Sequence, residues 1–404
     1  MHGDVAVICA SPPGINPGMD SVDRAFLYLA NKYQFQDRIR FYHLYPASRA
    51  SDDGGQGSIS YSVIPSTEAF FRSHQVIIYW GDFLHMRQYH QGVARRLVQS
   101  GLSKDLETAQ LRAREVFLQS GEELDTLGKS LTFGSTLIFN TLSDEMHAAY
   151  HAALARFLKF CRAAWFRDVY SAFKACQIRG VFEPNCLGID CANLIDPDQV
   201  YPLASRPVAA DQVGIFLGRT GGNIEAMVQF AFEVTKGLGC KPAWLRWGDS
   251  YAFPALAAIF QLAAIRSLEA FSEQPASQAR DSIAELLKYR AIVTDTYHVC
   301  VNAWNLGVPA ICLVQTDFSR PRNVNFGDSF ARRDKRQVFM SMYDALEFLV
   351  SGDELASHEF RKARILRLLD LLHSGRAIAA IQSRIRSHAG CAETSLMQVL
   401  AGLL

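Results

Sequence analysis

The chain has 404 residues, of which 49% are hydrophobic and 20% are charged, and its formal net charge at pH 7 is +1. This length exceeds one ordinary hydrophobic core and predicts two domains. The near-neutral charge argues against bulk electrostatic binding of nucleic acid, and no apolar run reaches the roughly 20 residues of a membrane span. The N-terminus lacks the features of a signal peptide, so we expect a cytoplasmic protein.

The first half alternates short apolar segments with segments of helical periodicity. Strands are expected at residues 4–10, 40–45, 76–80 and 132–140. Helices are expected at residues 22–31, 92–100, 107–120 and 148–165. Such alternation predicts a parallel sheet with helices on both faces.

Residues 196–211 contain three prolines and no strong periodicity, and we interpret them as an interdomain linker. The second half repeats the pattern of the first. We therefore expect an α/β protein with two Rossmann-like domains whose parallel sheets face a cleft, resembling the arrangement of GT-B glycosyltransferases. The expected units are an N-terminal domain over 1–205 on the acceptor side, a C-terminal domain over 206–352 on the donor side, and helices over 353–404 that can pack back on the first domain.

The nine cysteines include no C-x-x-C pair, and most of them lie in apolar segments. This dispersed, odd-numbered set predicts reduced and buried thiols rather than disulfides or a zinc site.

Residues 291–313 read AIVTDTYHVCVNAWNLGVPAICL, a pattern of strand, polar turn, amphipathic helix and second strand. The turn places His298 where a parallel strand ends and a helix begins, a position at which α/β proteins collect ligands and anions. A histidine there can contact a phosphate and exchange a proton near neutral pH. The alternative is a capping turn formed by Asp295 or Thr296, with His298 merely hydrogen-bonded.

Other polar residues also follow predicted strands. Arg219, Gly221 and Gly222 form a glycine-rich turn suited to an anion, and the less favoured alternative is a tight turn with a solvated arginine. Asp82 and His85 could form an acid/base pair or bind a sugar hydroxyl, or Asp82 could cap a helix.

Two further cations belong to this set of candidates. Arg246 ends another strand beside a tryptophan, and Lys335 lies in a basic run at residues 332–336. Both could contact an anionic ligand. The alternatives are a core position for the tryptophan and a solvated face for the basic run.

Short segments in a fixed order resemble the polysaccharide pyruvyl transferase family. They are RDVYS at 167–171, GIDCA at 188–192, DTYH at 295–298 with GVP at 307–309, and DKR at 334–336. The resemblance implies a GT-B-like fold and transfer of a pyruvyl group from phosphoenolpyruvate onto a sugar of a glycan or lipid-linked saccharide, as a ketal. A lipid-linked acceptor would bring peripheral membrane contact. The transfer requires no metal and no cofactor, so we expect neither.

The resemblance gives His298 the role of acid/base or phosphate contact. Arg219, Arg246 and Lys335 are its cation candidates, and Thr296 and Tyr297 are expected on the donor side. Thr296 stands where the family usually has an arginine. Either Arg219 or a residue of the 332–336 run supplies the missing charge, or the donor differs.

Two other functions compete with pyruvyl transfer. The first is a GT-B-like glycosyltransferase that uses a nucleotide sugar, whose pyrophosphate the turns at 218–222 and 295–298 could hold. The second is a non-catalytic glycan-binding relative, which the absence of the expected arginine at Thr296 favours.

Overall fold

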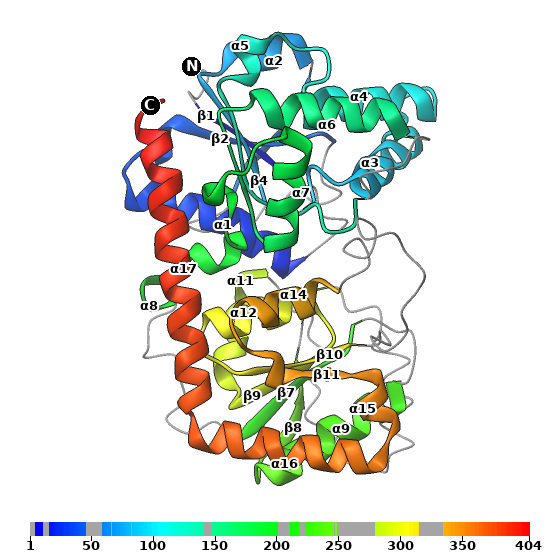
Figure 1. Ribbon diagram of the computed structural model, residues 1–404, viewed down its shortest axis with the longest axis vertical. Coiled ribbons are helices and arrows are strands. Elements are labelled where there is room, and N and C mark those ends of the chain that lie inside the picture. The colour runs from blue at the N-terminus through cyan, green and yellow to red at the C-terminus, as the bar shows by residue number, and fades with distance from the viewer. Residues whose placement is uncertain are drawn as a thin grey trace.

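The computed structural model of the protein describes residues 5–10, 16–45, 59–65, 67–81, 83–140, 147–200, 211–218, 224–245, 247–248, 279–314 and 334–404. Within these ranges the chain forms two parallel sheets flanked by helices, one above the other in Figure 1. The structure confirms two α/β domains of Rossmann type with a helical C-terminal region. The expected domain boundary at 205/206 lies outside the described residues.

The first sheet has six parallel strands in the order β3-β2-β1-β4-β5-β6. They are β1 (Val5–Cys9), β2 (Ile39–His43), β3 (Tyr61–Val63), β4 (Val76–Trp80), β5 (Ser130–Ser135) and β6 (Ala163–Phe166). Strands β1, β4 and β5 are buried along their whole length because helices cover both faces of the sheet. The strand order reverses direction between β1 and β4, which marks this point as a ligand position in α/β folds.

Eight α-helices belong to the described part of this half. They are α1 (Pro17–Lys32), α2 (Thr67–Ser73), α3 (Arg87–Gln99), α4 (Leu106–Leu118), α5 (Leu124–Leu127), α6 (Ala148–Phe160), α7 (Val169–Arg179) and α8 (Pro197–Val200). The helix expected over 148–165 is wrong at its end, because α6 stops at Phe160 and the chain turns into β6. The apolar pattern continues across this turn, which is why periodicity alone did not reveal it.

The second sheet has five parallel strands in the order β11-β10-β9-β7-β8. They are β7 (Gln212–Phe216), β8 (Lys241–Trp244), β9 (Ala291–Thr294), β10 (Ala310–Val314) and β11 (Leu349–Ser351). Its order reverses between β7 and β9, so the turns after these two strands lie at the switch point of the sheet.

Helices surround the second sheet and then return to the first domain. The described ones are α9 (Ile224–Gly237), α11 (Ala279–Glu285), α12 (Tyr297–Asn305), α14 (Lys335–Met342), α15 (Gly352–Ala356), α16 (His358–Ser374) and α17 (Arg376–Ala401). None of the helices in the described ranges is long and apolar enough to cross a bilayer.

Helix α17 runs along one side of both sheets, from the lower domain to the upper one in Figure 1. Near its end Glu393 pairs with the Lys32 ammonium at 2.6 Å and accepts a hydrogen bond from the Tyr33 hydroxyl at 2.7 Å. Buried α17 side chains, Leu396 among them, belong to one apolar core that includes residues of both sheets. The helix therefore fastens the two domains to each other.

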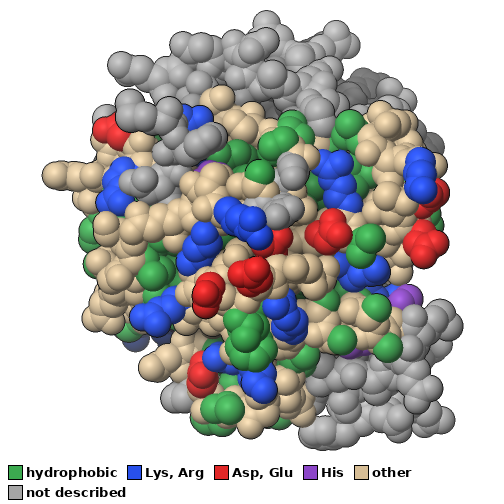
Figure 2. All heavy atoms as spheres, turned by 90° about the horizontal axis from the view of Figure 1, so that it is seen from above, with side chains coloured by type: hydrophobic (Ala, Val, Ile, Leu, Met, Phe, Trp, Pro, Cys, Tyr) green, Lys and Arg blue, Asp and Glu red, His purple; other side chains and the backbone are tan. Residues whose placement is uncertain are grey.

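The face seen in Figure 2 carries basic and acidic side chains close to one another. The described part of this face shows no broad area of one charge, in keeping with the formal net charge of +1. A site for an anion must therefore come from a few local cations rather than from the field of the whole molecule.

Candidate functional site

The two switch points face each other across the boundary between the domains. Helix α1 follows β1, and α12 follows β9. Asn16 starts α1 by accepting hydrogen bonds from the backbone N–H groups of Gly18 at 3.1 Å and Met19 at 3.4 Å, and Pro17 occupies the first helical position. The first turns of α1 and α12 then meet.

His298 lies at this contact and is only 8% exposed. A Cβ atom added to Gly18 would stand 2.1 Å from Nδ1 of His298, so only glycine lets the two helices approach this closely. Asn302, one turn further along α12, links the two helices. Its side-chain amide donates to the His298 carbonyl at 2.8 Å and to the hydroxyl of Ser21 on α1 at 3.1 Å. His298 therefore packs against the first domain.

Asp295 connects the two turns at the switch point of the second sheet. Its carboxylate accepts a hydrogen bond from the Gly218 backbone N–H at 2.8 Å and from the Thr296 hydroxyl at 3.0 Å. Thr296 occupies the N-cap position of α12, but its hydroxyl turns to Asp295 rather than to the helix. Thr296 thus stabilises the turn and brings no positive charge.

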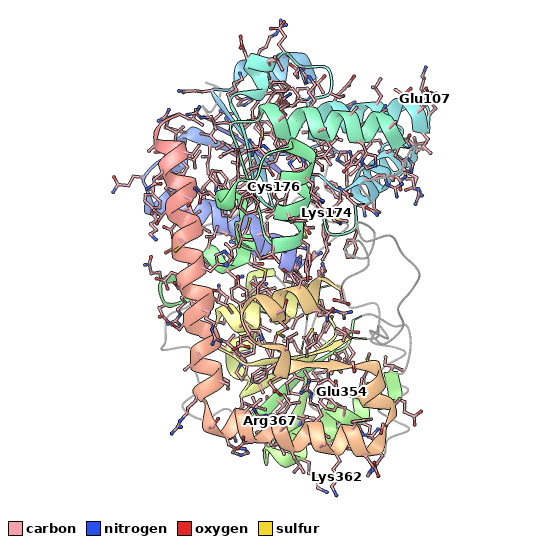
Figure 3. The ribbon with its side chains drawn as sticks, viewed as in Figure 1. Glu107, Lys174, Cys176, Glu354, Lys362 and Arg367 are labelled. Carbon is pink, nitrogen blue, oxygen red and sulfur yellow. The ribbon has the colours of Figure 1, made fainter. Side chains whose placement is uncertain are left out.

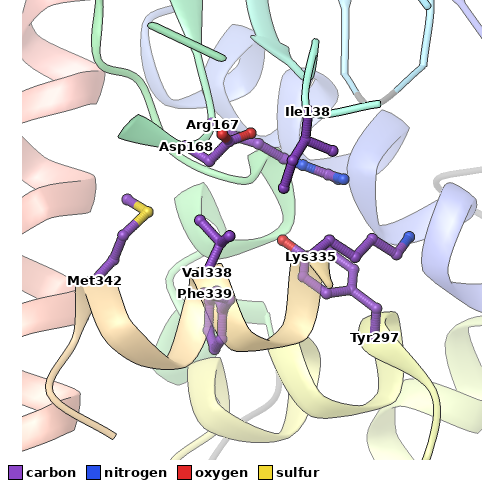
Figure 4. A pocket seen from close by; sticks show the side chains of 8 residues that line it. All are labelled: Ile138, Arg167, Asp168, Tyr297, Lys335, Val338, Phe339 and Met342. Atoms are coloured by element: carbon purple, nitrogen blue, oxygen red, sulfur yellow. The ribbon is translucent and has the colours of Figure 1, made fainter. Parts of the chain in front are cut away.

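A small pocket lies beside this contact, between the domains. Its lining residues are Ile138, Arg167, Asp168, Tyr297, Lys335, Val338, Phe339 and Met342. Figure 4 shows Ile138, Arg167 and Asp168 reaching it from the upper domain and the remaining side chains from α12 and α14. We call this cavity the interdomain pocket.

Arg167 and Tyr297 meet in the interdomain pocket over a buried carboxylate. The Arg167 guanidinium pairs with Asp190 at 3.2 Å, and both side chains are 3% exposed. The Tyr297 hydroxyl donates to the same Asp190 oxygen at 3.0 Å. Since Arg167 also stacks over the Tyr297 ring at 4.7 Å, Asp190 fixes both side chains that face the pocket.

Lys335 brings a second cation to the same place from the first turn of α14. Its ammonium lies 4.5 Å from the centre of the Tyr297 ring and 4.9 Å from that of Phe83. Phe83 belongs to the turn after β4, at the switch point of the first sheet. Two cations, one from each domain, thus share an aromatic surface, an arrangement that supports binding of an anion with an apolar part.

Arg336, the other described basic residue of the 332–336 run, has a structural role; Arg332 and Arg333 lie outside the described residues. Arg336 donates to the backbone carbonyls of Asp295 and Leu313, the latter at 3.0 Å, and pairs with Asp334. It therefore ties α14 to the ends of β9 and β10 and fixes the position of Lys335 next to it.

Asp168 supports the wall of the pocket. It caps α7 by accepting from the Ser171 backbone N–H at 2.8 Å, and it also accepts from the hydroxyls of Ser171 at 2.7 Å and Thr136 at 2.8 Å. Ser171 in turn accepts from the Leu137 backbone N–H at 2.7 Å. The loop that carries Ile138 is thereby fixed to α7.

Lys174 stabilises the same loop from within the protein. It is 1% exposed, and its ammonium donates to the carbonyls of Leu137 at 3.1 Å, Ile138 at 2.7 Å and Asn140 at 2.8 Å. These three acceptors match the three donors of an ammonium group. The residue shapes the pocket from behind without reaching it.

The structure does not bring His85 to the pocket. The residue is fully buried, and its ring packs against those of Tyr79 and Phe157. Burial lowers the pKa of His85 to about 3, so the imidazole is neutral at physiological pH. Its expected partner Asp82 lies outside the described residues, as do Arg219, Gly221, Gly222 and Arg246.

Arg167 and Asp190 are the residues that our candidate site omitted. Both belong to the segments that resemble the pyruvyl transferases, RDVYS and GIDCA, but we treated them as motif members rather than as ligand contacts. The signal that points to Arg167 is its position directly after β6. The helix expected over 148–165 covers most of this strand and therefore conceals the signal. Within the described residues, no group of His, Cys, Asp and Glu side chains is arranged to hold a metal ion.

No protein-family model matches the chain, and no curated protein matches it. Among solved structures, the UDP-GlcNAc 2-epimerase of Neisseria meningitidis bound to UDP-GlcNAc is similar with a TM-score of 0.55 and 10% identity, over 98% of this chain and 99% of that one. MnaA of S. aureus with UDP is similar with a TM-score of 0.50 and 8% identity, over 99% and 97%. At such identities the likeness shows the fold alone, which is GT-B-like, and it does not support membership of the pyruvyl transferase family.

Proposed function

We propose that this protein is a GT-B-like, sugar-modifying enzyme that binds the phosphate groups of a nucleotide sugar in the interdomain pocket. The observation that carries the proposal is the pair of cations from opposite domains, Arg167 and Lys335, over the ring of Tyr297. The proposed donor class rests on the similarity of fold to proteins whose structures contain UDP or UDP-GlcNAc.

In this proposal the residues of the pocket have different roles. Arg167, oriented by Asp190, offers a planar fork to a phosphate, and Lys335 offsets charge that develops as the bond to the sugar breaks. Phe83 and Tyr297 supply apolar contact. In this proposal His298 supports the contact between the domains rather than the ligand, since its ring packs against Gly18 and does not line the pocket.

Pyruvyl transfer from phosphoenolpyruvate is the second candidate, and one observation favours it. Four of the segments that resemble the pyruvyl transferases, RDVYS, GIDCA, DTYH and DKR, meet at the pocket. Asp190 contacts Arg167 and Tyr297, and Lys335 lies over the Tyr297 ring. Phosphoenolpyruvate carries a phosphate and a carboxylate, which two cations could bind separately. Against it stands Thr296, which offers no charge where the family usually has arginine.

A panel of UDP, UDP-GlcNAc, phosphoenolpyruvate and inorganic phosphate distinguishes the candidates by thermal shift and calorimetry. A ligand present at about 100 times its dissociation constant stabilises the protein by roughly 2.7 kcal/mol. Stabilisation by UDP or UDP-GlcNAc, with none by phosphoenolpyruvate, supports the first candidate, and the reverse supports the second. If none of the four ligands binds, both candidates are wrong.

Two variants test whether the ligand occupies the interdomain pocket. Lys335→Gln removes the half-buried cation, and we expect it to weaken binding by about tenfold. Lys236→Gln removes an exposed lysine on α9, far from the pocket, and should leave the affinity unchanged. Equal effects of the two substitutions would contradict a site at Lys335.

A further inference from the structure

Two cysteines face each other within the first domain, behind the pocket. Cys176 belongs to α7, where Figure 3 shows it above Lys174, and Cys186 ends a short helical turn at Pro184–Cys186. Their sulfur atoms are 3.4 Å apart, and the residues are 7% and 5% exposed. A separation of about 3–3.5 Å is the near-attack range for reacting atoms.

The surroundings of the two sulfur atoms differ. The Cys176 sulfur accepts a hydrogen bond from the Glu183 backbone N–H at 3.5 Å, and its thiol points to the Glu183 carbonyl at 3.7 Å. Cys186 points to the Ala172 carbonyl at 3.7 Å, and burial together with the Cys176 thiol raises the pKa of Cys186. Because Cys176 receives a backbone N–H donor, we assign it as the thiol that reacts first.

The chain between the cysteines reaches the surface. Its residues Val181 and Phe182 are 56% and 76% exposed, so the loop that joins the two cysteines lies at the surface. Only nine residues separate the two cysteines, and a covalent bond between them would close a short loop.

We propose that Cys176 and Cys186 form a reversible disulfide when the protein meets a small disulfide oxidant such as oxidised glutathione. The Cys176 thiolate attacks the oxidant, forms a mixed disulfide and releases one molecule of glutathione. The Cys186 sulfur then attacks the Cys176 sulfur, releases the second glutathione and gives up its proton. The two protein thiols are oxidised and one oxidised glutathione is reduced, so two electrons and two protons are balanced.

The bond would act on the segments that form the buried salt bridge of the pocket. Helix α7 begins directly after Arg167 and Asp168, and Cys186 precedes Asp190 by four residues. A disulfide at the far end of both segments therefore restricts how they move relative to each other. The proposal is independent of the donor that the pocket binds.

The chain offers two internal references for the experiment. Cys300 and Cys312 are neighbouring thiols in the core of the second domain, 1% and 0% exposed, and should not react while the protein is folded. Cys391 is exposed on α17 and should acquire glutathione, which proves that the oxidant is active.

The test incubates the full-length chain with oxidised glutathione at neutral pH and maps disulfides by peptide mass spectrometry before and after dithiothreitol. We expect a 176–186 crosslinked peptide that has lost two hydrogens, reversal by dithiothreitol, and no 300–312 crosslink. The Cys186→Ser variant should retain glutathione on Cys176, while Cys176→Ser should form no adduct at Cys186.

Three outcomes overturn the proposal. The first is modification of Cys391 with no 176–186 crosslink in the wild-type chain. The second is stable glutathione on wild-type Cys176, which means that Cys186 does not complete the reaction. The third is a 300–312 crosslink that forms as fast as the 176–186 crosslink. Oxidation of both pairs would then result from unfolding and not from the position of Cys176 and Cys186 in the folded protein.

Discussion

The Tyr297 hydroxyl donates a hydrogen bond to the Asp190 carboxylate at 3.0 Å and thereby joins the two domains at the pocket. The same carboxylate holds Arg167, so one buried anion orients a cation of the first domain and a phenol of the second. Asp190 is 3% exposed, and a buried carboxylate of this kind is tolerated because both partners remain in place.

Tyr297→Phe removes this hydrogen bond and keeps the ring over which both cations lie. We expect it to lower the free energy of unfolding by about 1–2 kcal/mol, because the buried carboxylate loses a donor. Urea unfolding measures the change. Tyr28→Phe removes a comparable bond at the surface, to Gln199 at 3.2 Å, and should change stability by less than about 0.5 kcal/mol. If Tyr297→Phe lowered the free energy of unfolding as little as Tyr28→Phe, the Tyr297 hydrogen bond would not hold the two domains together.

Gly18→Ala tests the contact between α1 and His298. The new Cβ would lie 2.1 Å from Nδ1 of His298, so the first turns of α1 and α12 must separate. We expect a loss of about 1–3 kcal/mol of stability. Gly92→Ala on α3 is the matched control, because nothing lies within 4 Å of its added Cβ, and alanine there should stabilise the helix by about 0.5–1 kcal/mol. Similar results for both substitutions would show that His298 does not hold the helices together.

Strands that are buried on both faces could be predicted from the sequence, because they are unbroken apolar runs between polar turns. Strand β4 spans Val76–Trp80 as expected. Strand β3 was not predicted, since Tyr61–Val63 is short and largely solvent-facing and so lacks such a run. Strand β6 was hidden because the apolar pattern of α6 continues into it.

The position of His298 at a strand end could be predicted locally, but its surroundings could not. The residues that meet at the pocket are far apart in the chain, and 107 positions separate Asp190 from Tyr297. No local periodicity reports such a contact. Arg167 directly follows β6 and therefore lies at the carboxyl end of a strand. Because β6 was not predicted, this local indication of a site was missed as well.

Lys174→Met should be among the most destabilising substitutions in the first domain. It leaves the carbonyls of Leu137, Ile138 and Asn140 without the ammonium that they share, and we expect a loss of about 2–4 kcal/mol. Denaturant unfolding measures it. Lys104→Met is the control, because the Lys104 side chain is 80% exposed and its removal should cost less than about 0.5 kcal/mol. A small effect at Lys174 would mean that water can replace the ammonium.

Asp23 makes the stability of the first domain depend on pH. It is a buried residue of α1, and the Tyr61 hydroxyl donates to it at 2.7 Å. Burial raises its pKa from 3.8 to about 7, against the lowering effect of the Tyr61 and Cys9 hydrogen bonds. A raised carboxyl pKa gives stability that is complete below the unfolded pKa near 4 and is lost as the pH rises through about 7.

Asp23→Asn removes this titration and keeps an oxygen that accepts from Tyr61. We therefore expect the variant to gain stability relative to the wild type as the pH rises from 4 to 8, by a total of the order of 3 kcal/mol, with little further change above pH 8. Urea unfolding at each pH measures the difference. Asp105→Asn is the control: the backbone N–H of Thr108 lowers the pKa of Asp105, so its difference from the wild type should stay constant above pH 5. A constant difference for Asp23→Asn as well would show that its carboxyl is already ionised in the folded protein at pH 5.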